Sequence, residues 1–273
     1  MTQIALSAVL HSTTALMRSG RWADADHLLE AVVPADPAEQ LALTALRAEV
    51  AVDQDFAQAT NTGAAALELF EKALTDTPDE THRWDFAMLT LRKTYGVALR
   101  SSDQPVEKVA QGNELGRRAE ALRDSAPDHA RAGHAAFYAG VIADNLRTQP
   151  ADAFAHYTTA LELGERSSDQ MVISLALRHL GDHAHTAGDL KLARAQWERS
   201  TELRQQIGHL LGALAQQALL AVLIKDEGNP AGAAVLATEI NRWSRQVDLP
   251  WLTAETAALS GGGSDHQAGG EDD

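Results

Sequence analysis

The stretch that decides the fold is "RHLGDHAHTAGDLKLARAQWERS", which runs from Arg178 to Ser200. Apolar and small residues recur in it at three- and four-residue spacings, as in amphipathic helices, on both sides of a tight Gly-Asp turn. The same stretch places His179, His183 and His185 within seven residues. It therefore predicts a helical hairpin and raises the question of a metal site.

A helical wheel separates the three histidines. At about 100° per residue, with Leu180 at zero, the apolar residues of this helix lie within about 60° of it. His183 and His179 lie on the shoulder of that apolar stripe, whereas His185 lies on the far side of the helix. Geometry excludes a three-histidine metal site. His179 and His183 stay a weak candidate pair that needs a third ligand from another helix, and we expect them to pack at the helix seam.

The turn repeats along the chain. The segment "GDLKLA" (Gly188–Ala193) matches "GNPAGA" (Gly228–Ala233) about 40 residues later, and one period earlier lies Ala153. Near the N-terminus, "GRWADA" ends at Ala25 and "QDFAQA" ends at Ala59, a step of about 34 residues. We interpret each alanine as a small residue early in the second helix of a hairpin, where the two helices approach closely.

These residues resemble the tetratricopeptide repeat (TPR) family. The pattern fits the repeat at 169–207 best, with Leu180, Gly181, Gly188, Asp189, Ala193, Trp197 and Ser200. The repeat at 127–165 matches at Gly140, Ala153, Tyr157 and Ala160, and the first repeat at Gly20, Ala25 and a helix-ending Pro37. Gly96 marks the third repeat, whose second helix fits poorly.

The resemblance covers about residues 3–247 as six hairpins and implies a superhelical solenoid. No repeat has the Trp that the family usually carries early in its first helix. The longer period of the second half is similar to the TPR-like sensor arrays of bacterial signal-transduction regulators.

The predicted fold is therefore all-α: an α-solenoid of about six TPR-like hairpins with a short C-terminal capping helix. That helix begins at about Pro250 and places Trp251 and Leu252 against the last hairpin, because a solenoid needs its terminal apolar face covered. The solenoid domain spans 1–260, and the Gly-rich segment 261–273 is predicted to be a flexible acidic tail.

Composition narrows the function classes. The 273-residue chain has no cysteine, so disulfides and thiolate chemistry are excluded. Its formal charge of −15, from 38 acidic and 23 basic residues, disfavours nucleic acid and anionic membrane as partners. No basic segment precedes an early apolar run, and no apolar run approaches the roughly 20 residues that span a bilayer. We expect a cytoplasmic, bacterial protein.

The resemblance also indicates where a ligand would bind. In the TPR family the polar face of the first helix lines the concave groove, and here that face carries Arg178, Asp182 and His185. Alignment on Gly140 adds His134, Phe137, Val141, Asp144 and Asn145, and alignment on Gly96 adds Lys93, Val97 and Arg100. The first two repeats contribute the less polar set Leu10, Thr14, Met17, Thr44, Ala48 and Ala51, and the sixth contributes Ala218, Val222 and Lys225.

Three cations in this inferred groove, Lys93, Arg100 and Arg178, suit a carboxylate or phosphate group. Phe137 would supply an apolar anchor, and Asp144 with Asn145 would orient a peptide backbone. The alternative is that Arg178 and Asp182 form only an i, i+4 ion pair on a solvated face.

The leading functional hypothesis is a non-catalytic scaffold or adaptor that holds a protein or peptide, acidic or with a free carboxylate, in the groove. The second is a regulatory module that senses a small metabolite or signalling peptide. The third is an enzyme that recruited the groove, with the histidines as acid/base groups or metal ligands. No phosphate-loop, nucleophile-elbow or HExxH motif occurs, and no cofactor is predicted.

Overall fold

The computed structural model describes residues 5–101 and 104–260, and within them it contains helices and no strand. The first seven helices are α1 (Leu6–Arg18), α2 (Trp22–Glu30), α3 (Pro37–Gln58), α4 (Gly63–Asp76), α5 (Glu80–Arg100), α6 (Pro105–Asp124) and α7 (His129–Ile142). A π-helical turn, η1 (Ala143–Arg147), continues α7. The remaining helices are α8 (Pro150–Ser167), α9 (Gln170–Thr186), α10 (Leu190–Gln206), α11 (Leu210–Asp226), α12 (Pro230–Gln246) and α13 (Pro250–Ser260).

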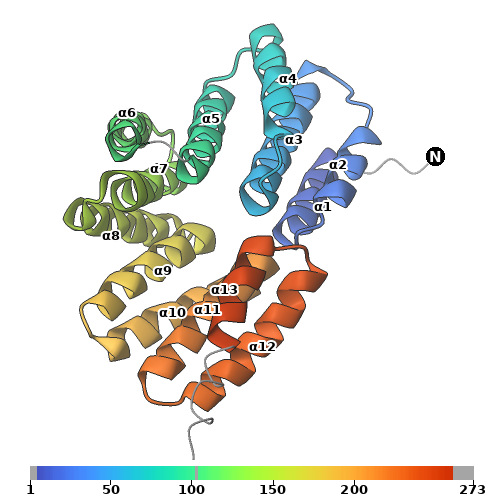
Figure 1. Cartoon of the computed structure of the whole chain (residues 1–273). Coiled ribbons are helices and arrows are strands. Elements are labelled where there is room, and N and C mark those ends of the chain that lie inside the picture. Colours follow the sequence, from blue (N-terminus) through green and yellow to red (C-terminus); the bar gives the residue numbers. More distant parts are fainter. Residues whose placement is uncertain (1–4, 102–103, 261–273) are drawn as a thin grey trace, which may run out of the picture.

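Successive helices pair as six hairpins, followed by α13, which packs against α12 and α11 (Figure 1). The predicted all-α solenoid of six TPR-like hairpins with a capping helix is confirmed. In α13, Leu252 is fully buried as expected, whereas Trp251 is 48% exposed and does not cover the last hairpin. The predicted tail at 261–273 lies outside the described residues. In the part of the chain that is described, no helix is both long and apolar enough to cross a membrane.

Glycine on one helix and a large aromatic ring on its partner lock two of the hairpins together. A Cβ added at Gly181 would overlap the indole of Trp197, and one added at Gly140 would overlap the ring of Tyr157. Both aromatic side chains are buried, and Trp197 Nε1 also donates to the carbonyl of Arg178 at 2.8 Å. The absence of a side chain on the first helix is thus what lets the second helix approach.

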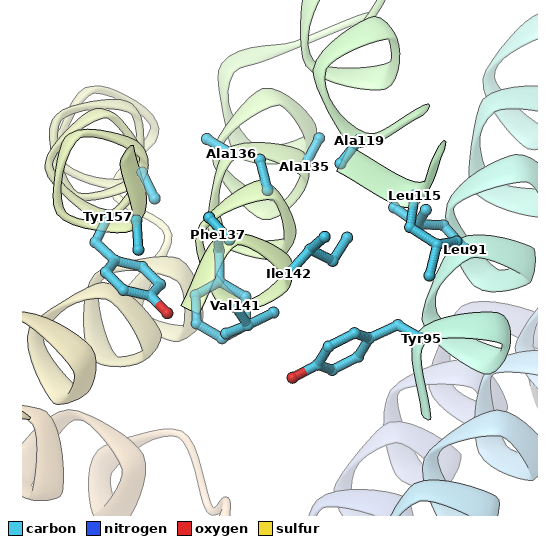
Figure 2. Close-up of a cluster of buried hydrophobic side chains, with 14 of the residues drawn as sticks. Leu91, Tyr95, Leu115, Ala119, Ala135, Ala136, Phe137, Val141, Ile142 and Tyr157 are labelled. Atoms are coloured by element: carbon cyan, nitrogen blue, oxygen red, sulfur yellow. The ribbon is translucent and has the colours of Figure 1, made fainter. Parts of the chain in front are cut away.

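The core that these contacts build is continuous through the middle hairpins. In Figure 2 Phe137, Val141 and Ile142 of α7 lie between Tyr157 on one side and Leu91 and Tyr95 on the other. Most of the buried apolar residues of α5 through α9 belong to one cluster, so these helices pack as one unit, whereas Leu89 and Ala184 belong to neighbouring clusters.

Aspartate caps set the start of four inner helices. The side chains of Asp36, Asp79, Asp128 and Asp169 accept hydrogen bonds from first-turn backbone N–H groups of α3, α5, α7 and α9. Such caps satisfy N–H groups that have no partner within the helix. These aspartates therefore give a common origin for comparing positions between hairpins.

When positions are counted from these caps, three of the residues by which the repeats were aligned in the sequence prove to be wrong. Gly181 and Gly140 each lie twelve residues after their caps, but the residue twelve after Asp79 is Leu91, not Gly96. Ala59 is the left-handed C-cap of α3, with φ of 58°, and is not an early residue of a second helix. Pro37 begins α3 rather than ending a helix, because proline fits the first turn.

The solenoid curls into a ring in which the first hairpin meets the last (Figure 1). A buried apolar cluster joins Met17 and Trp22 to Leu211, Leu249 and Leu252. We call this contact the seam. Its polar margin includes hydrogen bonds from Arg18 Nη1 to the Ile207 carbonyl (3.4 Å) and from Gln58 Nε2 to Asp248 Oδ2 (3.3 Å).

The contact between Gly181 and Trp197 predicts a change in stability opposite to the one that helix propensity predicts. Propensity alone makes Gly→Ala in a helix favourable by up to about 1 kcal/mol. We expect Gly181→Ala instead to lower the free energy of unfolding by about 1–3 kcal/mol, because the new methyl group forces the Trp197 ring out of its place. Urea denaturation followed by circular dichroism measures the difference.

Gly96→Ala is the matched control, because an added Cβ there meets only Phe56 at 3.4 Å and the flexible end of Arg100 at 3.6 Å. It should leave stability unchanged or raise it by up to about 1 kcal/mol. Equal, stabilising effects of the two substitutions would contradict the interlock.

Candidate functional site

The inner face of the ring is formed by the sides of α1, α3, α5, α7, α9 and α11 that face its centre (Figure 1). The side chains thirteen positions after each N-cap, in chain order, are Arg18, Glu49, Arg92, Val141, Asp182 and Val222. Positively and negatively charged side chains therefore lie at equivalent positions along the inner helices.

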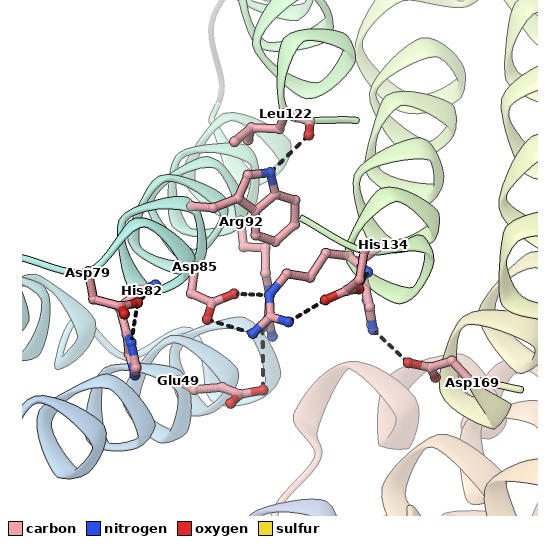
Figure 3. Close-up of polar contacts among 11 residues, drawn as sticks. Glu49, Asp79, His82, Asp85, Arg92, Leu122, His134 and Asp169 are labelled. Atoms are coloured by element: carbon pink, nitrogen blue, oxygen red, sulfur yellow. Dashed lines mark hydrogen bonds and ion pairs between the residues drawn. The ribbon is translucent and has the colours of Figure 1, made fainter. Parts of the chain in front are cut away.

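A dense ion-pair network occupies the α5–α7 part of the inner face (Figure 3). Arg131 donates through Nε and Nη2 to the two carboxylate oxygens of Asp85, at 2.7 and 2.9 Å, a bidentate geometry. Its Nη1 also pairs with Asp128 at 2.6 Å. The carboxylates of Asp85 and Asp128 thus hold the guanidinium in one orientation.

Arg92 is the central cation of this network. Its guanidinium lies 3.9 Å from Glu49 and 3.9 Å from Asp53, both on α3. Burial raises the pKa of Glu49 and of Asp53, although the charge of Arg92 opposes the rise in each. Burial disfavours the charged form of Arg92, but Tyr138 and the two carboxylates outweigh it and raise its pKa. This cation therefore stays charged among its neighbours.

A second network joins η1 to α8 and α9. Tyr157 donates its hydroxyl proton to Asp144 Oδ2 at 2.9 Å, and His183 Nε2 lies 3.2 Å from the same oxygen. Asn145 donates to the Tyr95 hydroxyl at 2.7 Å. The π-helical turn brings Asp144 and Asn145 to these partners, and such turns are frequent at functional sites. Nothing in the sequence pattern predicted it.

His179 and His183 pack in the contact between α9 and α8, as expected of residues between two helices. The His179 ring stacks on Tyr157 with centroids 4.7 Å apart, and burial next to Arg178 holds its pKa well below the usual value. His183 contacts the rings of Tyr157 and Phe154 and pairs with Asp144. Within the described residues, no group of three or more His, Asp or Glu side chains is arranged to hold a metal ion.

The structure separates the three residues of the predicted polar stripe. Arg178 Nη1 and Asp182 Oδ2 form the i, i+4 ion pair at 2.5 Å, with each side chain about one-third exposed. His185 turns away from them, pairs with Asp226 of α11 at 2.8 Å and packs on Trp197. Arg178 and Asp182 thus stay together, and His185 instead joins two hairpins.

Of two further predicted groove residues, Phe137 lies elsewhere than expected and His134 does not. Phe137 is only 6% exposed and packs against Tyr138, Tyr157 and His179, so it is a core residue and not an exposed anchor. His134 does reach the inner face, where its Nε2 lies 3.8 Å from Asp169. Burial lowers its pKa, against the pull of Asp169.

Lys93 and Arg100 line a pocket between α3 and α5 that Arg178 does not reach. Besides these two cations its walls are Val52, Asp55, Phe56, Thr60, Asn61, Arg92, Gly96 and Val97. Phe56 and Val97 are at least half exposed there. The predicted trio of cations is therefore two sites, a pocket with Lys93 and Arg100 and an inner face with Arg178.

Sequence reasoning missed Arg18, Glu49, Asp53, Asp85 and Arg92. Alignment on Gly96 placed the inner-face positions of α5 five residues too late in the sequence. On α3 the same positions were placed one residue too early, so Ala48 was assigned to the inner face in place of Glu49. The signal that locates the missed residues is the capping aspartate in "PADPAE", "DTPDE" and "SAPDHA".

No family model matches the chain, and no curated protein matches it. A similar solved structure is that of a signal transduction ATPase with numerous domains (STAND) with a tetratricopeptide repeat sensor, from Pyrococcus horikoshii. It is 14% identical with a TM-score of 0.48, covering 95% of this chain and 39% of that one. The chain thus spans well under half the length of that protein.

His209 gives a prediction for stability against pH. Its Nδ1 accepts the N-cap hydrogen bond of α11 from Gly212 at 2.9 Å. Burial and the charge of Arg204 lower its pKa to about 3. An unfolded chain binds a proton at this histidine below about pH 6.5, and the folded protein does not. Its contribution to stability is therefore complete above about pH 6.5 and is lost as the pH falls towards 3.

We expect the wild type to lose about 1–2 kcal/mol more stability than His209→Asn between pH 7 and pH 5. Asparagine preserves the cap, since Asn229 caps α12 through Oδ1 at 2.9 Å. Urea denaturation at a series of pH values measures the two slopes, and parallel slopes would show that His209 is not held neutral.

Proposed function

We propose that this protein is a non-catalytic binding protein that holds an extended peptide segment on the inner face of its ring. The observation that carries the proposal is the set of fixed, partly exposed charges of both signs on that face. The side chains of Arg92, Arg178 and Asp182 are 22%, 32% and 34% exposed, so they are held by neighbours yet reachable.

The dimensions suit a peptide. An inner helix of 17 residues, such as α9, is about 25 Å long, which matches an extended segment of about seven or eight residues. Ion pairs and hydrogen bonds already fix the side chains, so binding would cost little conformational entropy. A peptide with an acidic residue or a free carboxylate would pair with Arg92 or Arg178 in exchange for their present partners.

A regulatory role is the second candidate, and the seam favours it. The first and last hairpins meet through a limited set of side chains, so a ligand inside the ring could bias the seam between closed and open states. A small metabolite or signalling peptide would then act by changing this contact. A bound ligand that leaves the shape of the protein unchanged in X-ray scattering would argue against this second role.

The peptide proposal is tested with a probe selected on the protein itself. Linear peptides of eight residues with free carboxyl ends are selected by display on the wild type, and the tightest is labelled at its N-terminus. We expect Arg92→Gln and Arg178→Gln each to weaken its binding at least tenfold in fluorescence anisotropy, about 1.4 kcal/mol.

Arg117→Gln is the matched control, since Arg117 is 74% exposed on the outer helix α6 and, among the described residues, forms an ion pair with Glu114 alone. It should bind as the wild type does. Wild-type affinity in both inner-face variants would contradict the proposal, and a loss in Lys93→Ala and Arg100→Ala alone would move the site to the α3–α5 pocket.

A further inference from the structure

Arg204 is a buried cation that has no acidic partner among the described residues. It belongs to the outer helix α10, yet its side chain extends between α9 and α11 and the residue is only 7% exposed. Its Nε donates to Ser174 Oγ of α9 at 2.8 Å, and it forms no ion pair with any described residue. Arg131 and Arg194, by contrast, each pair with two carboxylates.

Such a group is costly to bury. A charge removed from water loses hydration that only a counterion or several hydrogen bonds replace. The neutral Ser174 hydroxyl is itself committed to a buried relay, because Ser200 lies 3.2 Å from it and Gln216 donates to Ser200. The relay therefore fixes the position of the guanidinium without neutralising it.

The neighbours of Arg204 add positive charge. Burial and then the charge of Arg178 lower the pKa of Arg204 to about 10. The pKa of His209 is lowered by burial and by Arg204, Arg18 and Arg92. Arg178 is itself paired with Asp182, so Arg204 is the cation of this corner that lacks a carboxylate partner among the described residues.

The two terminal nitrogens of the Arg204 guanidinium have no hydrogen-bond partner among the described residues. Among the described residues, four side-chain polar atoms are fully shielded from solvent and also lack a hydrogen-bond partner. They are Thr13 Oγ1, Arg147 Nε, Gln196 Oε1 and Gln216 Oε1. The terminal nitrogens of Arg204 have no described hydrogen-bond partner and are not in that set, so they keep contact with solvent. One of them lies against Gly212, in the first turn of α11, where the helix dipole also favours an anion.

We propose that the corner formed by Arg204, Arg178 and the first turn of α11 is a binding site for an anionic group, a carboxylate or a phosphate. The Arg204 guanidinium is its base: Ser174 holds Nε, and neither terminal nitrogen has a hydrogen-bond partner among the described residues. The site does not depend on a peptide occupying the rest of the inner face.

The site also lies beside the seam. Arg18 of the first hairpin donates to the carbonyl of Ile207, in the loop that joins α10 to α11. The charges of Arg204 and of Arg18 both lower the pKa of His209, the N-cap of α11, so this histidine is a neighbour of both the site and the seam.

The test uses inorganic phosphate and acetate against chloride at constant ionic strength and pH 7.5. We expect at least one of the two anions to raise the melting temperature of the wild type saturably, beyond the effect of chloride. Arg204→Met should abolish that rise and should melt at or above the wild-type temperature in chloride, because the uncompensated charge is gone. The anion that acts identifies the ligand group as phosphate or carboxylate.

Arg199→Met is the matched control, since Arg199 lies on the same helix, is 53% exposed and pairs with Glu165. It should retain the full anion effect. A wild type that responds to neither anion would overturn the proposal, as would an Arg204→Met variant that keeps the response. If Arg204→Met does not fold, Arg178→Gln replaces it and should weaken the anion at least tenfold. An unchanged affinity in Arg178→Gln would overturn the site as defined.

Discussion

The apolar contact between the first and last hairpins is the interaction on which the rest of the molecule depends. Leu211 lies against Gly20, where even a Cβ would come within 2.8 Å of it, and Trp22, Leu249 and Leu252 complete the buried cluster. TPR-like hairpins need contact only their neighbours along the chain. Here the curvature returns α1 and α2 to α11 and α13, so the inner helices enclose a common face. The charges of that face then act on one another across the ring.

Much of the fold could be predicted from the sequence because the contacts that build it are local. The Gly181–Trp197 interlock joins two helices that follow one another directly, and turn glycines such as Gly188, with φ of 81°, occur where the period predicts. Two of the three exceptions share one cause. Ala59 and Gly96 are small residues that the pattern does not distinguish from interlock residues, although one ends a helix and the other faces the preceding hairpin.

The site was less predictable, for two physical reasons. The set of side chains on one face of a helix changes completely when the register is displaced, so the five-residue displacement on α5 selected Lys93 and missed Arg92. The periodic pattern within one hairpin also carries no information about its contacts with other hairpins. The pairing of His185 with Asp226 and the approach of Arg18 to Ile207 are both of this kind. The pair of Arg178 and Asp182 was predictable because both residues lie on one helix.

Closure of the ring is the central claim, and an electron–electron distance measurement tests it most directly. The chain has no cysteine, so spin labels can be attached solely at Ala23→Cys on α2 and Ala254→Cys on α13, both exposed positions on opposite sides of the seam. The account predicts one short, narrow distance population in solution, which broadens and lengthens when Leu211→Asp is added. A broad, long distribution in the parent protein, unchanged by Leu211→Asp, would show an open solenoid and contradict the account.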